Sequence, residues 1–259
     1  MTIGFRAFID FERPSQELIE AYRSLPSANI GDCCYKMNCM FDGIHSFNDI
    51  PLCGPAFTVK VPAGDNLVAQ LALDYAKPGD IIVIDGAGFT NRALVGGMMV
   101  TYTKEKQLGG FVVNGAIRDV DDIKNSPIPV YGITQTPLGP YRSGPGEMNV
   151  PVCCGGQVVM PGDIIVGDHD GIVVIPQKDA EELLQAVRNN LDHEQAEMKK
   201  MKSNIKKLYE LREKRADLQK RIEKAEGRFY FYGTGKEELE KLKAYEKTIE
   251  DMSKKGKRR

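Results

Sequence analysis

The sequence predicts an α/β domain followed by a long helical extension, and three observations support this. Helical stretches alternate with short apolar runs over the first 190 residues, which is typical of strands buried between helices. From about residue 177, helix-forming residues continue with no proline or glycine before Gly227. The charge also changes: residues 1–193 hold 14 basic and 23 acidic side chains, and residues 194–259 hold 21 and 13. We therefore place the α/β domain at 1–190 and a basic helical extension at 191–259.

The elements of the α/β domain follow from periodicity and from turn residues. Helices are expected where apolar residues recur every three to four positions, at 14–25, from Ser27 onward, at 66–76 and from about Arg92 to Gln107. Strands are expected where β-branched residues alternate or form short apolar runs between glycines and prolines, at 54–61, 81–84, 110–114, 130–133, 157–160, 164–166 and 172–175.

The extension predicts a helical hairpin or a coiled-coil arm. Apolar residues between Met201 and Ala225 recur at heptad spacing. A continuous helix over 179–226 would be about 70 Å long, at about 1.5 Å per residue. The aromatic cluster at 229–232 is bracketed by glycines and is expected to form a turn before a second amphipathic helix.

Several classes of protein are disfavoured by composition. No segment approaches the roughly 18 apolar residues that a membrane span requires, and the first 25 residues meet charges too early for a signal peptide. The six cysteines form no CxxC pair, which favours reduced, buried thiols over disulfides or a zinc site. Acids interleave with the lysines of the extension, which disfavours nucleic-acid binding. We expect a cytoplasmic protein that does not bind membranes.

A glycine pair in the middle of the domain predicts an anion site. If a helix begins near Gly96 and Gly97, the amides of Gly97, Met98 and Met99 have no partner within that helix. Free amides at a helix N-terminus suit a carboxylate.

A second charged group follows about 20 residues later. Arg118 offers a fork of donors for a carboxylate or an enolate oxygen. Asp119 and Asp122 beside it offer a hard, oxygen-only site for Mg²⁺ or Mn²⁺. On composition alone, a solvated helix start, with its acids near the positive end of the helix dipole, is the simpler explanation of this short motif.

This arrangement resembles the class II 4-hydroxy-4-methyl-2-oxoglutarate/4-carboxy-4-hydroxy-2-oxoadipate aldolases, a family that also contains the regulator of ribonuclease activity A. The signature of these aldolases is glycine, twenty residues, Arg-Asp, two residues, then an acid, and Gly97, Arg118-Asp119 and Asp122 match it. The resemblance covers roughly residues 15–190 and includes the segments GPAFTVKVPAGDN, KPGDIIVIDGAG, NGAIRDVDDI and GDHDGIVVIP. It implies a layered α/β sandwich of the ribonuclease-regulator-A-like type.

The resemblance also implies a function, namely a divalent-metal-dependent retro-aldol lyase that cleaves a 4-hydroxy-2-oxo diacid to pyruvate. Oxaloacetate decarboxylation would be a second activity on a small 2-oxo acid. Asp119 would bind Mg²⁺ (or Mn²⁺), with Asp122 holding the ion through water. Arg118 would contact the 2-oxo oxygen, and the backbone of Gly96, Gly97, Met98 and Met99 would take the pyruvoyl carboxylate. The family implies a homotrimer or hexamer.

Alternatives stay open beside the lyase. A non-catalytic, protein-binding regulator is the main one, although that branch lacks the full Arg-Asp pair. A methyltransferase is disfavoured because no glycine-rich nucleotide loop follows the first strand. A Schiff-base mechanism is disfavoured because Lys104 and Lys106 look solvated. Val95 replaces a large aromatic that is common in the family, which leaves the substrate's distal group open. The extension is longer than the family implies, and we expect it to contact a neighbouring subunit or another protein.

Overall fold

The computed structural model describes residues 2–41, 43–226 and 235–255. The chain divides into two compact units, Met1–Asn190 and Leu191–Arg259. No helix within the described ranges combines the length and the apolar character that crossing a bilayer demands.

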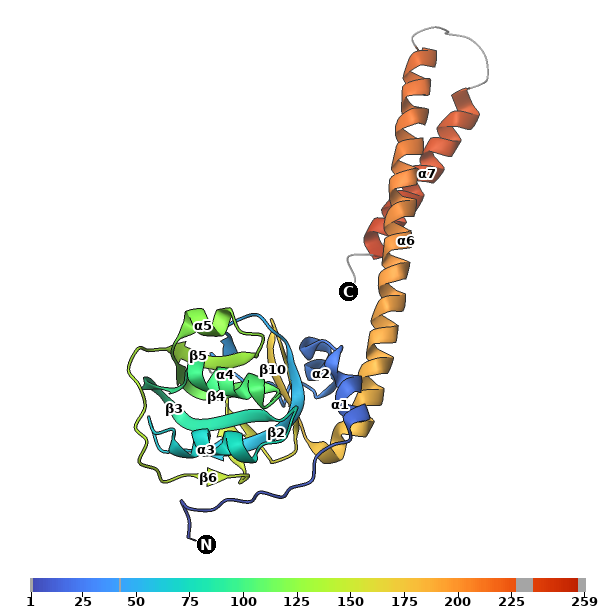
Figure 1. The fold of residues 1–259 in the computed structure, drawn as a ribbon. Helices are drawn as coiled ribbons and strands as arrows, with labels where there is room; N and C mark the ends of the chain where they lie inside the picture. The colour runs from blue at the N-terminus through green and yellow to red at the C-terminus, as the bar shows by residue number, and fades with distance from the viewer. Residues whose placement is uncertain (1, 42, 227–234, 256–259) are drawn as a thin grey trace. The chain divides into compact units, whose positions relative to one another are not determined.

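The first unit is built on an eight-stranded mixed sheet (Figure 1). Its centre is four parallel strands in the order β5-β4-β3-β2, with bounds Val130–Gln135, Gly110–Ile117, Ile81–Val95 and Leu52–Lys60. The antiparallel pair β9 (Ile164–Asp168) and β10 (Gly171–Ile175) extends the sheet beyond β2, and β1 (His45–Ser46) closes the other edge. The short β6 (Glu147–Met148) also pairs with β2.

Both faces of the central strands are covered. On one face, Ile82 and Ile84 pack with residues of three helices: α3 (Leu67–Tyr75), α4 (Gly97–Glu105) and α5 (Val120–Lys124). On the other, Ile81 and Val83 pack with the hairpin of β7 (Val152–Cys154) and β8 (Gln157–Val159). Burial on both faces explains why the run at 81–84 is apolar at every position rather than alternating. The predicted layered α/β fold is confirmed.

One predicted boundary was wrong. The helix expected from about Arg92 begins only at Gly97, because Ala93 and Val95 still belong to β3 and pair with Ala116 and Ile117 of β4. The pairing shifts register three times after Asp85, so the second half of β3 is irregular. Ala93, Leu94 and Val95 are buried, and their pairing and packing override the local helical periodicity.

The remaining helices of the first unit sit beside β9 and β10. They are α1 (Gln16–Arg23), α2 (Ser27–Cys33), the 3₁₀ turn η1 (Gln177–Asp179) and the start of α6 (Ala180–Glu226). The hydroxyl of Tyr22 in α1 donates to the carbonyl oxygen of Ala180 at 2.7 Å, and Leu184 and Val187 are buried. The first turns of α6 therefore belong to the core of this unit.

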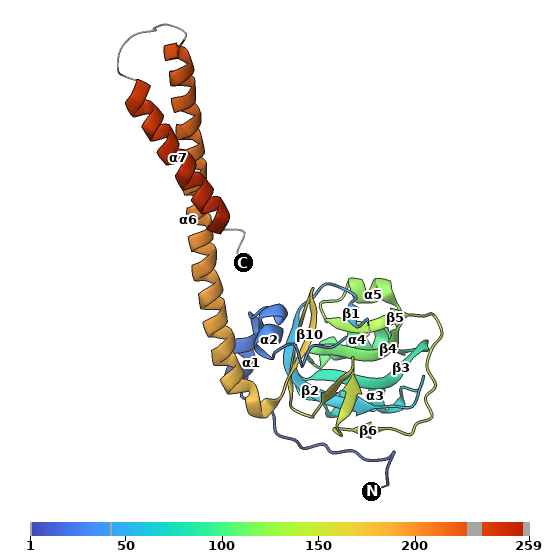
Figure 2. The ribbon, with the colours of Figure 1, turned by 180° about the vertical axis from the view of Figure 1, so that it is seen from behind.

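The described part of the second unit consists of two antiparallel helices. Helix α7 (Gly235–Lys255) runs back along α6, as both Figure 1 and the reverse view in Figure 2 show. Arg215 of α6 forms an ion pair with Glu246 of α7 at 3.4 Å. The 47 residues of α6 correspond to about 70 Å. This agrees with the predicted helical extension; the turn expected at 229–232 lies outside the described residues.

A buried ion pair ties the N-terminal segment to the start of β3. The carboxylate of Asp80 is fully buried and accepts hydrogen bonds from Arg13 Nε at 2.8 Å and Nη2 at 2.7 Å. It also accepts one from the amide of Lys77 at 2.8 Å. Such a carboxylate is tolerated in the core because all three donors point at it.

We expect Asp80→Ala to destabilise the first unit by about 3–5 kcal/mol, because it leaves a guanidinium largely buried without its counter-charge. The measurement is urea unfolding followed by circular dichroism. Glu20→Ala is the matched control, since Glu20 pairs with Arg23 in solvent, with half of each side chain exposed, and should barely move the midpoint. Equal losses in the two variants would contradict this assignment.

Candidate functional site

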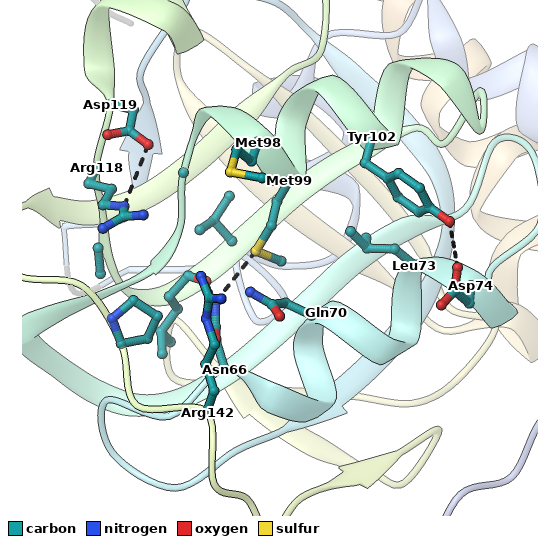
Figure 3. A pocket seen from close by; sticks show the side chains of 15 residues that line it. Asn66, Gln70, Leu73, Asp74, Met98, Met99, Tyr102, Arg118, Asp119 and Arg142 are labelled. Carbon is teal, nitrogen blue, oxygen red and sulfur yellow. Dashed lines mark hydrogen bonds and ion pairs between the residues drawn. The ribbon is translucent and has the colours of Figure 1, made fainter.

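A cavity of about 300 Å³ opens between α3, α4 and the carboxyl ends of β3 and β4 (Figure 3). This is at the small end of ligand pockets, which range over roughly 300–1,000 Å³. Its walls are Asn66, Gln70, Leu73, Asp74, Ala93, Leu94, Val95, Gly96, Met98, Met99, Tyr102, Arg118, Asp119, Pro140 and Arg142. The position agrees with a general property of parallel sheets, in which the strand ends form a crevice for ligands.

The N-terminus of α4 forms one wall. Gly96 precedes the helix, and Gly96, Met98 and Met99 line the cavity. The first amides of an α-helix lack a partner within the helix, so the N–H groups of Met98 and Met99 can serve an anion. The amide of Gly97 already donates to Asp119 Oδ2 at 3.0 Å. The helix dipole adds positive potential at the same place.

Arg118 and Asp119 lie directly against this end of α4. The backbone of Arg118 is fixed by its amide, which donates to the carbonyl oxygen of Val95 at 2.9 Å. Arg118 Nε lies 3.5 Å from Asp119 Oδ2 (Figure 3), and about a third of each side chain is exposed. Asp119 adopts a left-handed conformation, with φ 58° and ψ 47°. That conformation is uncommon for a residue with a side chain, and it turns the carboxylate back toward Gly97.

Two glycines make this approach possible. A Cβ on Gly96 would lie 2.6 Å from Asp119 Oδ2 and 3.0 Å from Arg118 Cγ. A Cβ on Gly97 would lie 2.7 Å from Asp122 Oδ2. Both carboxylates therefore pack directly against the bare backbone of the helix start, which no other residue type at 96 or 97 would allow.

Of the two predicted metal ligands, only one lines the cavity. Asp119 lines the cavity, whereas Asp122 lies behind Gly97 and is not part of the lining. No group of three or more acidic, histidine or cysteine side chains in the part of the chain that the structure describes could hold a metal. Mg²⁺ commonly binds through one or two carboxylates and keeps several waters. A hard cation held by Asp119, with Asp122 nearby, fits this donor set.

The far side of the cavity contains residues that the sequence analysis did not identify. Asn66 is buried, its Nδ2 donates to the carbonyl oxygen of Leu94 at 2.8 Å, and its Oδ1 has no hydrogen-bond partner among the described residues. Gln70 and Arg142 stand beside it in Figure 3. Tyr102 donates to Asp74 Oδ1 at 2.6 Å at the outer edge. Asn66 lies in the GDN segment that contributed to the resemblance, but no local pattern indicated Arg142.

The cysteines do not take part in this site. None of them lines the cavity, and burial raises the pKa of the Cys34 and Cys53 thiols to about 11. Thiols with raised pKa values are poor metal ligands and poor nucleophiles at neutral pH. The lysines near the motif, Lys104 and Lys106, also lie outside the lining.

Fold and site together define an α/β protein with a small anion-binding cavity, formed by a helix N-terminus, an arginine and a carboxylate. The RraA-like family model, described as Aldolase/RraA, matches residues 27–174. The chain belongs to this family, as its resemblance predicted.

Similar proteins are named either as aldolases or as members of an RNase inhibitor family. A protein of Halalkalibacterium halodurans named "Putative 4-hydroxy-4-methyl-2-oxoglutarate aldolase" is 36% identical over 190 residues, which cover 73% of this chain and 90% of the relative. The 4-hydroxy-4-methyl-2-oxoglutarate aldolase of Thermus thermophilus is 33% identical over 113 residues, 44% of this chain and 69% of its own. The crystal structure of Streptomyces coelicolor RraAS2, described as an unusual member of the RNase ES inhibitor RraA family, matches with a TM-score of 0.66 and 30% identity over 74% of this chain and 99% of that one.

We expect Gly96→Ala to weaken binding of pyruvate at least about tenfold, because the added methyl displaces the carboxylate of Asp119 and the side chain of Arg118. Calorimetric titration in the presence of Mg²⁺ measures this. Lys104→Ala, on an exposed face of the same helix, should bind as the wild type does. Unchanged affinity in Gly96→Ala, with an unchanged melting temperature, would show that this end of the cavity does not bind the ligand.

Proposed function

We propose that this chain is a divalent-metal-dependent retro-aldol lyase that cleaves a 4-hydroxy-2-oxo diacid to pyruvate, with oxaloacetate decarboxylation as a second activity. The observation that carries the proposal is the meeting of Arg118, Asp119 and the free amides of α4 in one small cavity. The aldolase names of two relatives support the same reaction class.

Each group has a role that its position supports. The amides of Met98 and Met99 would take the carboxylate next to the 2-oxo group. The guanidinium of Arg118 would lie against the 2-oxo oxygen, where negative charge develops when the C–C bond breaks and leaves an enolate. Loss of CO₂ from oxaloacetate leaves the same enolate, so one arrangement serves both reactions.

Asp119, with Asp122 acting through water, would hold Mg²⁺ or Mn²⁺. A divalent cation supplies Lewis-acid polarisation of the 2-oxo oxygen when it is bound. The hydrogen bond from Gly97 and the proximity of Arg118 Nε fix Oδ2 of Asp119, so the carboxylate needs no reorganisation when a ligand arrives.

The far wall of the cavity has polar groups that suit the hydroxyl and the second carboxylate of a diacid substrate. Asn66 Oδ1 is an acceptor without a partner in the described part of the chain, which suits a substrate hydroxyl. Arg142 would bind the distal carboxylate, since it lies across the cavity from the helix end.

A second copy would complete this cavity. Large apolar side chains lie exposed on the cavity wall and on the helices that form it, namely Leu71, Tyr75, Met98 and Tyr102. Met98 is 84% exposed although it sits at the helix end described above. We propose that a neighbouring subunit covers them in a homotrimer or hexamer.

The alternative function is a non-catalytic regulator that binds another protein. The structural relative RraAS2 is described within an RNase-inhibitor family, which makes this the second candidate. An inhibitor needs no metal-binding carboxylate, whereas Asp119 keeps an uncommon backbone conformation here. Six other non-glycine residues of the described chain also have a positive φ, so it is the place of the carboxylate in the cavity beside Arg118, more than its backbone, that favours the lyase.

We expect Asp119→Asn to reduce pyruvate release from oxaloacetate and from 4-hydroxy-4-methyl-2-oxoglutarate at least about 100-fold. Asparagine preserves the shape and tolerates the left-handed backbone, so the loss reports the charge. A coupled dehydrogenase assay with Mg²⁺, and with chelator, measures it. Asp121→Asn, an exposed acid two residues away, is the control. No turnover by the wild type would favour the regulator, and turnover in chelator would exclude the metal mechanism.

Arg142→Gln should raise the KM for 4-hydroxy-4-methyl-2-oxoglutarate about tenfold or more, since it removes the counter-charge for the distal carboxylate. Initial rates over a range of substrate concentrations give KM and kcat separately. The control is Arg92→Gln, because Arg92 stacks on the Tyr141 ring at 3.9 Å instead of lining the cavity. An equal KM in Arg142→Gln and wild type would place the distal carboxylate elsewhere.

A further inference from the structure

Part of α6 within the second unit extends beyond the described end of α7. Arg215 of α6 pairs with Glu246 of α7, and the two helices run antiparallel. Because both rise by about 1.5 Å per residue, the last residue of α7, Lys255, lies beside about residue 206 of α6. The stretch of α6 from Leu191 to about residue 205 is therefore left uncovered by α7.

This stretch has an apolar seam. Met198, Met201 and Ile205 are 48%, 50% and 45% exposed. Together with Leu191 and Leu208 they follow a heptad pattern, in which positions a and d are 191, 194, 198, 201, 205 and 208. Glu194 is the one polar residue among these six positions. Such a seam on a solvent-exposed helix is typical of a surface that pairs with another helix.

The charges around the seam are divided by sign. All acids of the segment precede all its bases, with Asp192, Glu194 and Glu197 in the first half and Lys199, Lys200, Lys202, Lys206 and Lys207 in the second. A second copy of the segment in antiparallel orientation places each acidic half beside a basic half. A parallel pair places like charges together, which costs free energy at these distances.

We propose that residues 191–208 of α6 pair in antiparallel fashion with the same residues of a second copy of this chain. The heptad positions fit this pairing: Met198 meets Met201 of the second copy, Glu194 meets Ile205, and Leu191 meets Leu208, which lies where α7 ends. The two-fold axis passes between Lys199 and Lys200, so the interface is isologous and closed. Glu194 then lies within reach of Lys202 and Lys206 of the second copy.

The pairing is independent of the proposed chemistry. The segment lies beyond residues 27–174, where the family model matches, and the solved relative that this chain covers to 99% aligns with only 74% of it. A homotrimer of the first unit has no two-fold axis and cannot pair all three of its arms internally, so pairing through α6 joins two trimers into a hexamer.

The first test compares two double variants of the full chain by light scattering after size-exclusion chromatography. Met198→Glu with Ile205→Glu places two charges in the seam and should halve the mass of the wild-type assembly. Ala196→Glu with Ser203→Glu places two charges, also seven residues apart, on exposed positions off the seam and should leave the mass unchanged. Circular dichroism confirms that both remain helical. A wild-type mass in the seam variant overturns the proposal.

The second test fixes the orientation. Carbodiimide joins a carboxylate to an ammonium group in direct contact. Within one helix, Asp192 and Lys206 are 14 residues apart, or about 21 Å, too far for such a bond. Mass spectrometry of the cross-linked wild type should find Asp192 or Glu194 joined to Lys206. Links from Lys206 only to carboxylates of residues 1–190 would show that this stretch docks on a first unit instead, and would overturn the pairing.

Discussion

The site depends on one close approach, that of the turn after β4 to the first residues of α4. The amide of Gly97 donates to Asp119, whose left-handed backbone directs its carboxylate to that amide. Gly96 and Gly97 have no side chains, and an added Cβ at either would collide with a carboxylate oxygen. The strands supply the frame for this contact, because β3 and β4 are adjacent and parallel and so end at the same edge of the sheet. Without Gly96, the side chains of Arg118 and Asp119 could not lie this close to the end of α4.

This proximity shapes the electrostatics of the cavity. A guanidinium, a carboxylate and a helix N-terminus lie within a space of about 300 Å³. Each compensates the others in the absence of ligand, since Asp119 accepts from Gly97 and lies 3.5 Å from Arg118 Nε. A site preorganised in this way stabilises new charge without moving its own dipoles, which is the property that an enolate-forming reaction requires.

The sequence predicted the part of the fold and of the site that is local in the chain. Strands buried on both faces appear as continuous apolar runs, and Arg118 and Asp119 are adjacent, so both features were recognisable. The length of β3 was missed because Ala93 and Val95 are held by strand pairing that no local window contains. Asn66 and Gln70 reach the cavity from the start of α3, and Arg142 from a loop, so both segments lie well away from Arg118 in the sequence. The unusual backbone of Asp119 follows from packing on two glycines 22 and 23 residues earlier, which spacing alone does not indicate.

The two walls of the cavity differ in how much change they can accept. At the end of α4, the carboxylates of Asp119 and Asp122 pack against Gly96 and Gly97, where a larger residue would collide with them. Few substitutions are therefore tolerated at this wall. On the opposite wall, Gln70 projects from a helix surface and Arg142 from a loop, and neither is locked by a hydrogen bond within the described structure. Evolution can therefore alter which molecule is accepted while leaving Gly96, Gly97, Arg118 and Asp119 unchanged. A family built on this plan is suited to diversify its substrates faster than its chemistry.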